Sequence, residues 1–342
     1  MKKYVAEFER PIIELETQLE ELKKTPSAHK ADIAREITYL EKQIAKLKVK
    51  TYTNLTPWQK VQLARHPERP HFSDYLKGIF SEFTEIHGDR LHGDDKAIIS
   101  GFAFLGSYKV IVVGTEKGKT TKEKVAHNFG MPHPEGYRKA ARLFELAGRF
   151  NLPVINFIDT PGAYPGIEAE ERGQAGAISN NLKILSDLDV PILSTVIGEG
   201  GSGGALALGV ADRIFMMENA YYSVIAPEGC ATILWGDAKK AEKAAAELSL
   251  TADKLVKLKL IDGIISEPLG GAQHNKEEVF ADLKSTLLKT LDDLTKINVD
   301  ELKKRRYQRL MAAGVFSEKD NLDVTRGIKI LRGDADENRS AN

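Results

Sequence analysis

Two glycine-bearing turns in the middle of the chain carry the residue types best suited to hold a negative charge. The first turn follows the apolar run 154–158, and the second, residues 198–204, follows the apolar run 192–197. Five of the seven residues in the second turn are glycine. Glycine lets the backbone come very close to a ligand, and N–H groups at a helix start bind an oxyanion, a phosphate or a carboxylate.

The two turns together could form one site built only from backbone. If the two apolar runs are neighbouring strands, the N–H groups of Gly162 and Ala163 can converge with those of Gly203 and Gly204 on one oxygen atom. Such an oxyanion hole stabilises an enolate or a similar anion without a nucleophilic side chain. We therefore predict these four residues as the catalytic backbone groups, with a tight structural turn as the simpler alternative.

The dense glycine run also matches two other motifs. Gly198, Gly200 and Gly203 fit the dinucleotide-binding fingerprint, and Gly200 and Gly204 flank Ser202 as in the nucleophile elbow of serine hydrolases. A hydrolase also needs a histidine and an acid, and the one histidine downstream lies in a polar stretch. Both interpretations leave the first turn unexplained. A serine hydrolase using Ser202 stays as the enzymatic alternative, and a scaffold without catalysis as the other.

Several other chemistries are excluded by residue counts and spacing. Residues 114–120 resemble a phosphate-binding loop, but three residues separate the glycines where four are needed. The single cysteine, Cys230, excludes an internal disulfide and a cysteine-rich zinc site. His127 and His133 have no third ligand at metal spacing. We therefore predict no metal on this chain.

The glycine turns need buried strands and helices around them, and hydrophobic periodicity predicts these elements. Strands 98–105 and 108–114 are joined by a two-residue hairpin turn, Gly106-Ser107. Buried strands that lead into a glycine turn and a helix indicate stacked βα units of an α/β fold. Further strands are predicted at 213–217, 221–225 and 261–265, helices at 75–86, 134–150, 239–248, 252–258, 277–296 and 300–312, and irregular chain at 51–72.

The first fifty residues predict a helical hairpin. Apolar residues recur at alternating spacings of four and three in two stretches, which is the seam pattern of a coiled coil. The pattern is interrupted at Thr25-Pro26-Ser27, where the chain can turn back. We divide the chain into a hairpin at 1–50, a main domain at 51–315 and a polar tail at 316–342. Because its core is small, we expect the hairpin to rest on the main domain or on a partner.

Composition limits the classes of function. The chain has 342 residues, of which 42% are hydrophobic and 29% charged, as in a soluble globular protein. Its 49 basic and 49 acidic residues cancel, so nothing in the overall charge favours nucleic acid. The start of the chain is charged and predicts no signal peptide, and glycines and a glutamate break the most apolar stretch. We therefore expect a cytoplasmic protein without a membrane span.

Longer motifs resemble a known family. They are residues 117–124, 128–132, 134–140, 157–166, 170–174, 198–205, 227–231 and 251–252. Together they resemble the carboxyltransferase alpha subunits of bacterial acetyl-CoA carboxylase, in the same order, over about residues 5–313. The sequence departs from the family pattern at Thr115-Glu116 and at Ala126-His127. No anion contact is therefore assigned to those positions.

The resemblance implies a fold, a reaction and partners. It implies a crotonase-like fold of stacked ββα units and an α2β2 assembly with a carboxyltransferase beta subunit. The reaction it implies moves a carboxyl group from carboxybiotin, borne by the biotin carboxyl carrier protein, to acetyl-CoA. The product is malonyl-CoA for fatty acid synthesis, and biotin carboxylase belongs to the larger complex. No cofactor is expected to be bound covalently to this chain, and zinc is expected only on the beta subunit.

The resemblance also implies roles for individual residues. The backbone N–H groups of the two glycine turns would hold the ureido oxygen of biotin. Residues implied to shape the carboxybiotin slot are Tyr164, Pro165, Gly166, Gly200 and Gly201. Basic residues that could meet coenzyme A phosphates or the carrier protein are Lys117, Lys119, Lys122 and Arg138, with a solvated charged loop as the alternative.

Overall fold

The computed structural model describes residues 4–24 and 30–314, so the predicted turn at 25–27 and tail at 316–342 lie outside the described residues. Within these ranges one mixed sheet holds the domain together, in the strand order β1-β2-β3-β4-β5-β6-β8, with β7 paired to β5. The strands are β1 (Ser81–Glu85), β2 (Ile98–Leu105), β3 (Tyr108–Thr115), β4 (Val154–Thr160), β5 (Ile192–Gly201), β6 (Arg213–Met217), β7 (Tyr221–Ser223) and β8 (Gly263–Ile265).

The first three strands form an antiparallel meander, and the pairs from β3 onward are parallel. Both β4 and β5 are buried along their whole length. A strand that is buried on both faces has a nearly continuous apolar sequence, and this pattern is the reason that both strands could be predicted. Their parallel pairing puts the carboxyl ends of both strands at the same edge of the sheet.

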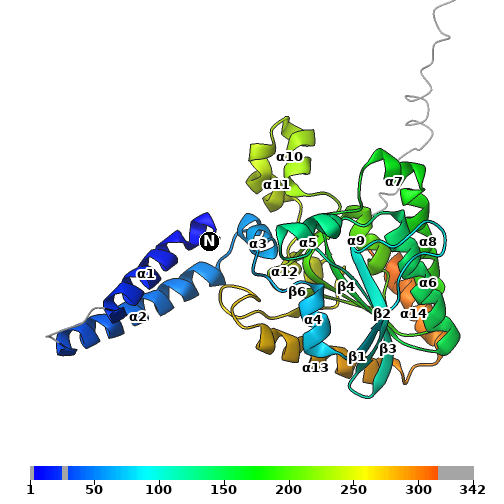
Figure 1. Cartoon of the computed structure of the whole chain (residues 1–342), viewed down its shortest axis with the longest axis horizontal. Helices are drawn as coiled ribbons and strands as arrows, with labels where there is room; N and C mark the ends of the chain where they lie inside the picture. Colours follow the sequence, from blue (N-terminus) through cyan, green and yellow to red (C-terminus); the bar gives the residue numbers. More distant parts are fainter. Residues whose placement is uncertain (1–3, 25–29, 315–342) are drawn as a thin grey trace, which may run out of the picture.

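Helices cover the sheet on both faces (Figure 1). They are α3 (Pro57–Ala64), α4 (Phe72–Ile79), α5 (Thr121–Ala126), α6 (Pro134–Phe150), α7 (Ile167–Glu171), α8 (Gln174–Asp187), α9 (Ser202–Gly209), α10 (Pro227–Trp235), α11 (Ala241–Glu247), α12 (Ala252–Lys257), α13 (Lys276–Leu294) and α14 (Val299–Met311). Helix α6 packs on α8 and on strands β2 and β3, whereas α4 packs on α13 and β4. The predicted α/β fold is thus confirmed, and so are the predicted strands 98–105 and 213–217 and the helix 134–150.

Two local predictions were wrong. The predicted helix 75–86 ends at Ile79, because Phe80 takes an extended conformation and β1 then pairs with the edge of β2. The segment 51–72, predicted as irregular, contains α3 and the start of α4. Thr56 caps α3 by accepting a hydrogen bond from the Gln59 N–H, and Pro57 follows at the first helical position. These are standard helix-start signals, and the prolines of the segment concealed them.

The N-terminal hairpin consists of α1 (Arg10–Lys24) and α2 (Lys30–Thr53), which extend away from the main domain (Figure 1). The two helices pack on each other and are joined by ion pairs, among them Lys48 to Glu16 at 2.6 Å. At the base of the hairpin, the Tyr52 hydroxyl donates to Glu9 at 2.8 Å. The Tyr4 ring meets the His66 ring with centroids 5.2 Å apart, which connects the start of the chain to the main domain.

Helix α14 packs against the core through a buried charge. Arg306 on α14 is 1% exposed and donates to both carboxylate oxygens of Asp212 at 2.9 Å. The same guanidinium donates to the backbone carbonyls of Leu185, Leu188 and Val190, in and after the end of α8. A planar guanidinium can satisfy all of these acceptors at once, which a lysine cannot. Among the described residues, no helix is long and apolar enough to cross a membrane.

Candidate active site

The two glycine turns meet at the carboxyl edge of the sheet. Strands β4 and β5 pair in parallel, and after a register shift between Ile158 and Thr160 the pairing ends with Thr160 opposite Gly200. Strand β5 runs to Gly201, further than the predicted 192–197, and α9 begins directly at Ser202. The segment predicted as a turn over residues 198–204 is therefore divided between two elements: its first four residues end the strand, and its last three begin helix α9.

Gly204 lies directly against the first turn. A side-chain Cβ at position 204 would stand 2.5 Å from the Ala163 nitrogen and 2.6 Å from the Gly162 carbonyl carbon. Real Cβ atoms do not approach backbone so closely, so only glycine fits here without moving the backbone. The structure thus brings together Gly204 with Gly162 and Ala163, as the adjacency of the two turns required.

The N–H groups at this meeting point differ in availability. Helix α9 has Gly201 at its N-cap and no side-chain cap, so its first N–H groups, including those of Gly203 and Gly204, have no intrahelical acceptor. The Gly162 N–H, in contrast, donates to the Thr160 hydroxyl at 3.0 Å. This corrects one of the four predicted donors, because Thr160 occupies that N–H. Gly203, Gly204 and Ala163 remain the candidates.

The predicted slot residues Gly200 and Gly201 lie inside the sheet. Both are buried and pair with Tyr222 and Ser223 of β7. A Cβ at Gly201 would stand 2.1 Å from the Pro161 carbonyl oxygen. Their observed role is to let two chain segments pack closely beside the site.

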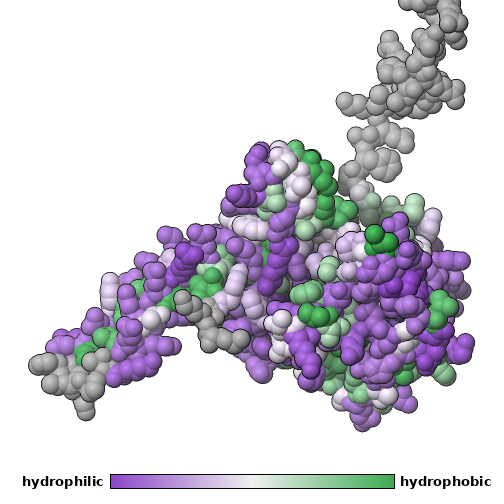
Figure 2. All heavy atoms as spheres, turned by 45° about the horizontal axis from the view of Figure 1, so that its top comes forward, coloured by the Kyte–Doolittle hydropathy of each residue, from purple (hydrophilic) through white to green (hydrophobic). Residues whose placement is uncertain are grey.

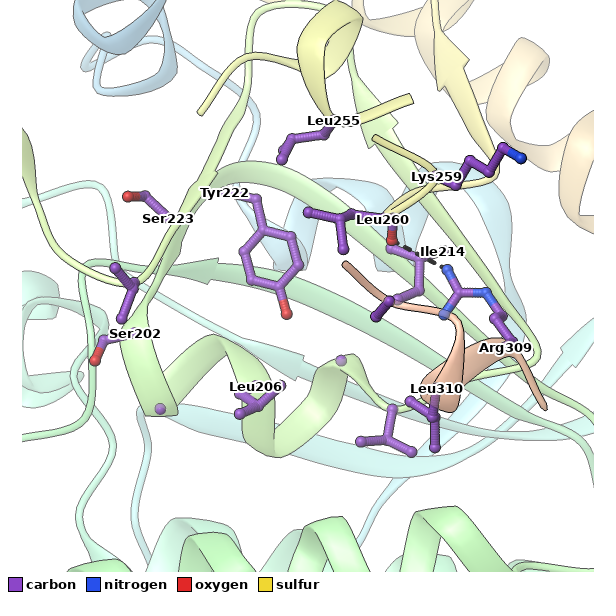
Figure 3. Close-up of a pocket in the computed structure, with 15 residues that line it drawn as sticks. Ser202, Leu206, Ile214, Tyr222, Ser223, Leu255, Lys259, Leu260, Arg309 and Leu310 are labelled. Atoms are coloured by element: carbon purple, nitrogen blue, oxygen red, sulfur yellow. Dashed lines mark hydrogen bonds between the residues drawn. The ribbon is translucent and has the colours of Figure 1, made fainter. Parts of the chain in front are cut away.

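A largely apolar cavity opens beside the start of α9 (Figure 3). Its volume is about 370 Å³. Ser202 and Gly203 line one end, Leu206 and Leu260 line the walls, and the Tyr222 hydroxyl points into the space. Burial raises the pKa of Tyr222 to about 12, so its hydroxyl stays protonated.

Ser202 lacks the surroundings of a nucleophile. Its side chain is exposed at the first residue of α9, where its backbone adopts a positive φ of 51°. No histidine or carboxylate belongs to the described residues that line the cavity beside it. The geometry therefore offers Ser202 no general base within this cavity.

A second cavity, of about 360 Å³, lies between the first glycine turn and the beginning of α8. Tyr164, Pro165 and Gly166 line it together with the beginning of α8. The Tyr164 ring stacks on His133 with centroids 4.4 Å apart, and its hydrogen bond with Glu168 raises the pKa of the phenol. Ile178, which lines this second cavity, lies 3.6 Å from the Cβ position of Gly203, which lines the first, so both cavities are close to the start of α9.

A cluster of charged side chains lies at the carboxyl ends of β4 and β5, around Glu199. Lys117 places its ammonium 2.6 Å from Asp159 and 2.6 Å from Glu199, and Arg65 lies 2.6 Å from Glu199. The Tyr221 hydroxyl donates to Glu199 at 2.7 Å. Burial by itself would raise the pKa of Glu199, but Lys117 and Arg65 outweigh it and lower the pKa to about 2. Glu199, Lys117 and Arg65 are thus all charged at neutral pH.

The four predicted anion-binding residues do not form one patch. Lys117 is held in the buried cluster, and Arg138 on α6 donates to Asp89 at 2.8 Å and to the Arg172 carbonyl at 2.9 Å. Lys119 pairs with Asp74, and Lys122 is exposed on α5. Only Lys119 and Lys122 of this set offer exposed ammonium groups.

Sequence reasoning missed two groups that adjoin the site. Arg65 follows α3, in the segment predicted as irregular, and Tyr137 on α6 places its hydroxyl 2.9 Å from the Cβ position of Gly204. Tyr137 lies in the motif 134–140, one of those that resemble the family, and this motif was the sequence feature that could have indicated its role. Among the described residues, no group of three or more histidine, cysteine or acidic side chains could hold a metal ion.

Solved structures with the same fold are carboxyltransferases and related enzymes. A chain of the Pseudomonas malonate decarboxylase hetero-tetramer superposes with a TM-score of 0.56 at 15% identity, covering 76% of this chain and 97% of that one. The beta subunit of P. aeruginosa geranyl-CoA carboxylase gives 0.53 at 18% identity, over 78% and 48% of the two chains. The transcarboxylase 12S structure gives 0.52 at 17% identity, over 72% and 43%. The chain thus has the crotonase-like fold of carboxyltransferases, as the resemblance implied.

Sequence comparison narrows this class to one family. Residues 5–314 match the family described as acetyl co-enzyme A carboxylase carboxyltransferase-like. The acetyl-coenzyme A carboxylase carboxyl transferase subunit alpha of Thermus thermophilus is 52% identical over 312 residues, which is 91% of this chain and 99% of that protein. The Vibrio campbellii subunit alpha is 54% identical over 90% of this chain and 98% of its own length. The chain belongs to the family of acetyl-CoA carboxylase carboxyltransferase alpha subunits and is a transferase component, not a serine hydrolase.

Proposed function

We propose that this chain, paired with a carboxyltransferase beta subunit, transfers the carboxyl group of carboxybiotin to acetyl-CoA and forms malonyl-CoA for fatty acid synthesis. The observation that carries the proposal is the contact of Gly204 with Gly162 and Ala163, at the uncapped start of α9. It offers backbone donors to one ligand oxygen in a largely buried place. The carboxybiotin is a substrate that the carrier protein brings, so no covalent cofactor is needed on this chain.

In the proposed reaction these donors hold the ureido oxygen of the biotin ring. The bond between the ring nitrogen and the carboxylate breaks, CO₂ leaves, and the electron pair stays on the ureido group. The N–H groups of Gly203, Gly204 and Ala163 stabilise the charge that develops on the oxygen. The ring nitrogen then takes a proton from the methyl group of acetyl-CoA, and the enolate attacks CO₂. Removing one such donor typically costs about 3–4 kcal/mol of transition-state stabilisation.

The two cavities support binding of a compact ring system at this point. The cavity beside Ser202 and Gly203 has mostly apolar walls, and its polar end is the start of α9. A bicyclic ring with one strongly accepting oxygen matches such a cavity, because apolar walls bind the ring and N–H groups bind the oxygen. Tyr164, Pro165 and Gly166 are proposed to border the slot from the second cavity, with Gly200 and Gly201 shaping the strand beneath.

An exposed apolar surface next to the cavity supports the beta subunit as a partner. Val224, which lines the cavity, is 76% exposed, and Ile233 and Leu234 on α10 are 75% and 60% exposed. Figure 2 shows apolar side chains gathered on the lobe that α10 and α11 form. Contiguous apolar surface of this kind is typical of protein–protein contacts. We propose that zinc is bound only by the beta subunit, and we expect a cytoplasmic α2β2 assembly that works with the biotin carboxyl carrier protein and biotin carboxylase.

The basic residues predicted as anion contacts have two different roles in the proposed function. Lys119 and Lys122 are proposed to meet the phosphates of coenzyme A or the carrier protein. Lys117 and Arg138 are proposed to support the site through their ion pairs rather than through the substrate.

The test is carboxyl transfer from malonyl-CoA to a soluble biotin analogue, run with this chain alone, with the beta subunit alone and with both. Activity only in the mixture is the expected result. A mixture that forms the complex in gel filtration but transfers no carboxyl group would overturn the proposal. Activity of this chain alone would overturn the division of the site between two subunits.

A further inference from the structure

Tyr137 carries a buried hydroxyl that has no hydrogen-bond partner among the described residues. Its side chain is fully buried on α6. Native proteins pair nearly all such groups, because an unpaired buried hydroxyl has lost its bonds to water and gained none in return. A hydroxyl kept in this state therefore calls for an explanation beyond packing.

The position of this hydroxyl is specific. The Tyr137 oxygen, the Ala163 nitrogen and the Gly162 carbonyl carbon surround one point, the Cβ position of Gly204, at 2.9, 2.5 and 2.6 Å. The phenol thus lies against the contact between the two glycine turns. Its hydroxyl is the closest side-chain atom to the Gly204 Cβ position.

The hydroxyl keeps its proton under all working conditions. Burial, and then the nearby Asp95 carboxylate, raise the pKa of Tyr137 well above its ordinary value. Asp95 itself is fixed, because it accepts hydrogen bonds from the backbone N–H groups of Ala97 and His133. A neutral phenol without a bound acceptor can rotate its O–H dipole about the C–O bond without breaking a hydrogen bond.

We propose that Tyr137 is a positioning residue of the anion-stabilising site, whose ring supports the Gly204–Ala163 contact and whose free O–H dipole turns toward the negative charge that forms there. The inference rests on the proposed function, because it needs an anion at this contact. A dipole in a dry, low-dielectric place stabilises a nearby charge more strongly than the same dipole in water. It acts when charge develops in the transition state and not when the neutral ring binds, so it should affect kcat and leave KM unchanged.

The chain offers a matched control in Tyr75. This tyrosine on α4 is also fully buried, and its hydroxyl also lacks a partner among the described residues. It packs against Phe157 and Phe280 and not against the glycine turns. Removing either hydroxyl deletes the same group from the same kind of environment, so the two changes should alter folding stability alike.

The experiment compares Tyr137→Phe and Tyr75→Phe with the natural chain, each assembled with the beta subunit and assayed for carboxyl transfer between malonyl-CoA and a biotin analogue. Both variants should keep the melting temperature of the natural chain or exceed it, because each loses an unpaired polar group. We expect Tyr137→Phe to lower kcat about tenfold, at unchanged KM for both substrates, and Tyr75→Phe to leave kcat unchanged. Equal kcat values for both variants would overturn the inference.

Fluorotyrosine at position 137 supplies the second readout. It restores the hydroxyl with almost the same shape as tyrosine, so kcat should return to the natural level or above. A kcat that stays at the level of Tyr137→Phe would show that packing and not the hydroxyl matters, and would also overturn the inference. If the natural chain itself is inactive with the beta subunit, the proposed function fails first, which separates the two outcomes.

Discussion

The ammonium group of Lys117 lies 2.6 Å from the carboxylate of Glu199, a residue inside the glycine run that ends β5. Lys117 follows β3 and Glu199 lies in β5, with β4 between them in the sheet. The pair therefore joins the carboxyl ends of three neighbouring strands, because Asp159 at the end of β4 shares the same ammonium. These ion pairs lie close to the contact between the two glycine turns and should help to hold the turns in place.

Replacing Lys117 by methionine should destabilise the fold strongly. The substitution leaves the buried carboxylates of Asp159 and Glu199 without a shared cation, and breaking a buried pair in this way typically costs about 3–5 kcal/mol. Urea denaturation of the natural and variant chains measures the change. Lys122→Met, at an exposed position, is the control and should stay within about 0.5 kcal/mol. Similar losses for both variants would contradict the structural role given to the cluster.

The contribution of Glu199 to stability should depend on pH. Its pKa is lowered to about 2 in the folded chain and returns to about 4.3 on unfolding. A lowered folded-state pKa gives stability that is present above the unfolded value and is lost as the pH falls toward the folded value. The difference in unfolding free energy between the natural chain and Glu199→Gln should therefore be constant above about pH 5 and shrink as the pH approaches 2. A difference that does not change between pH 7 and pH 3 would refute this assignment.

Gly204→Val should abolish carboxyl transfer. Its Cβ would push against the Ala163 nitrogen, and a shift of about 1 Å in a catalytic group can cost about a hundredfold in rate. Gly93→Ala is the matched control, because a Cβ there meets nothing within 4 Å. Circular dichroism and gel filtration with the beta subunit separate a catalytic loss from misfolding. A folded, assembled Gly204→Val variant with full activity would exclude this contact as the catalytic feature and would favour a scaffold.

Ser202→Ala should retain activity within about twofold. The serine side chain is exposed, and the cavity beside it has no histidine or carboxylate among its described lining residues. Backbone donors at the same helix start do not depend on this side chain. The measurement is the same transfer assay at saturating substrate. A loss of several orders of magnitude would instead mean that the hydroxyl takes part in the chemistry.

Local sequence patterns predicted those elements for which the hydrophobic spacing and the packing of neighbouring elements favour the same structure. Helix α6 was predicted with its bounds, Pro134–Phe150, because a proline starts it and its apolar spacing is regular. Residues 75–86 failed because apolar spacing continues from Tyr75 through Phe83 although the chain changes from helix to strand at Phe80. The end of β5 was missed because glycine has little strand preference, and only pairing with β4 and β7 keeps those residues extended.

The site was predictable where topology alone decides the geometry. Two buried parallel strands that neighbour each other must bring their following turns together, so the approach of Gly204 to Ala163 followed from the order of the elements. The ion pairs were not predictable in this way. Arg65 and Glu199 are 134 residues apart, and Lys117 and Glu199 are 82 apart. Which basic residues become buried depends on packing that no short motif encodes.

The Arg306 contact has a consequence for how the chain is made. Its guanidinium binds carbonyls beyond α8 and the carboxylate of Asp212, all of which are synthesised about a hundred residues earlier. A nascent chain that ends before position 306 leaves these acceptors and the Asp212 charge unpaired in the interior. The domain therefore completes its core only after Arg306 has been synthesised, and protease should cut stalled chains that end before this residue more readily than longer ones.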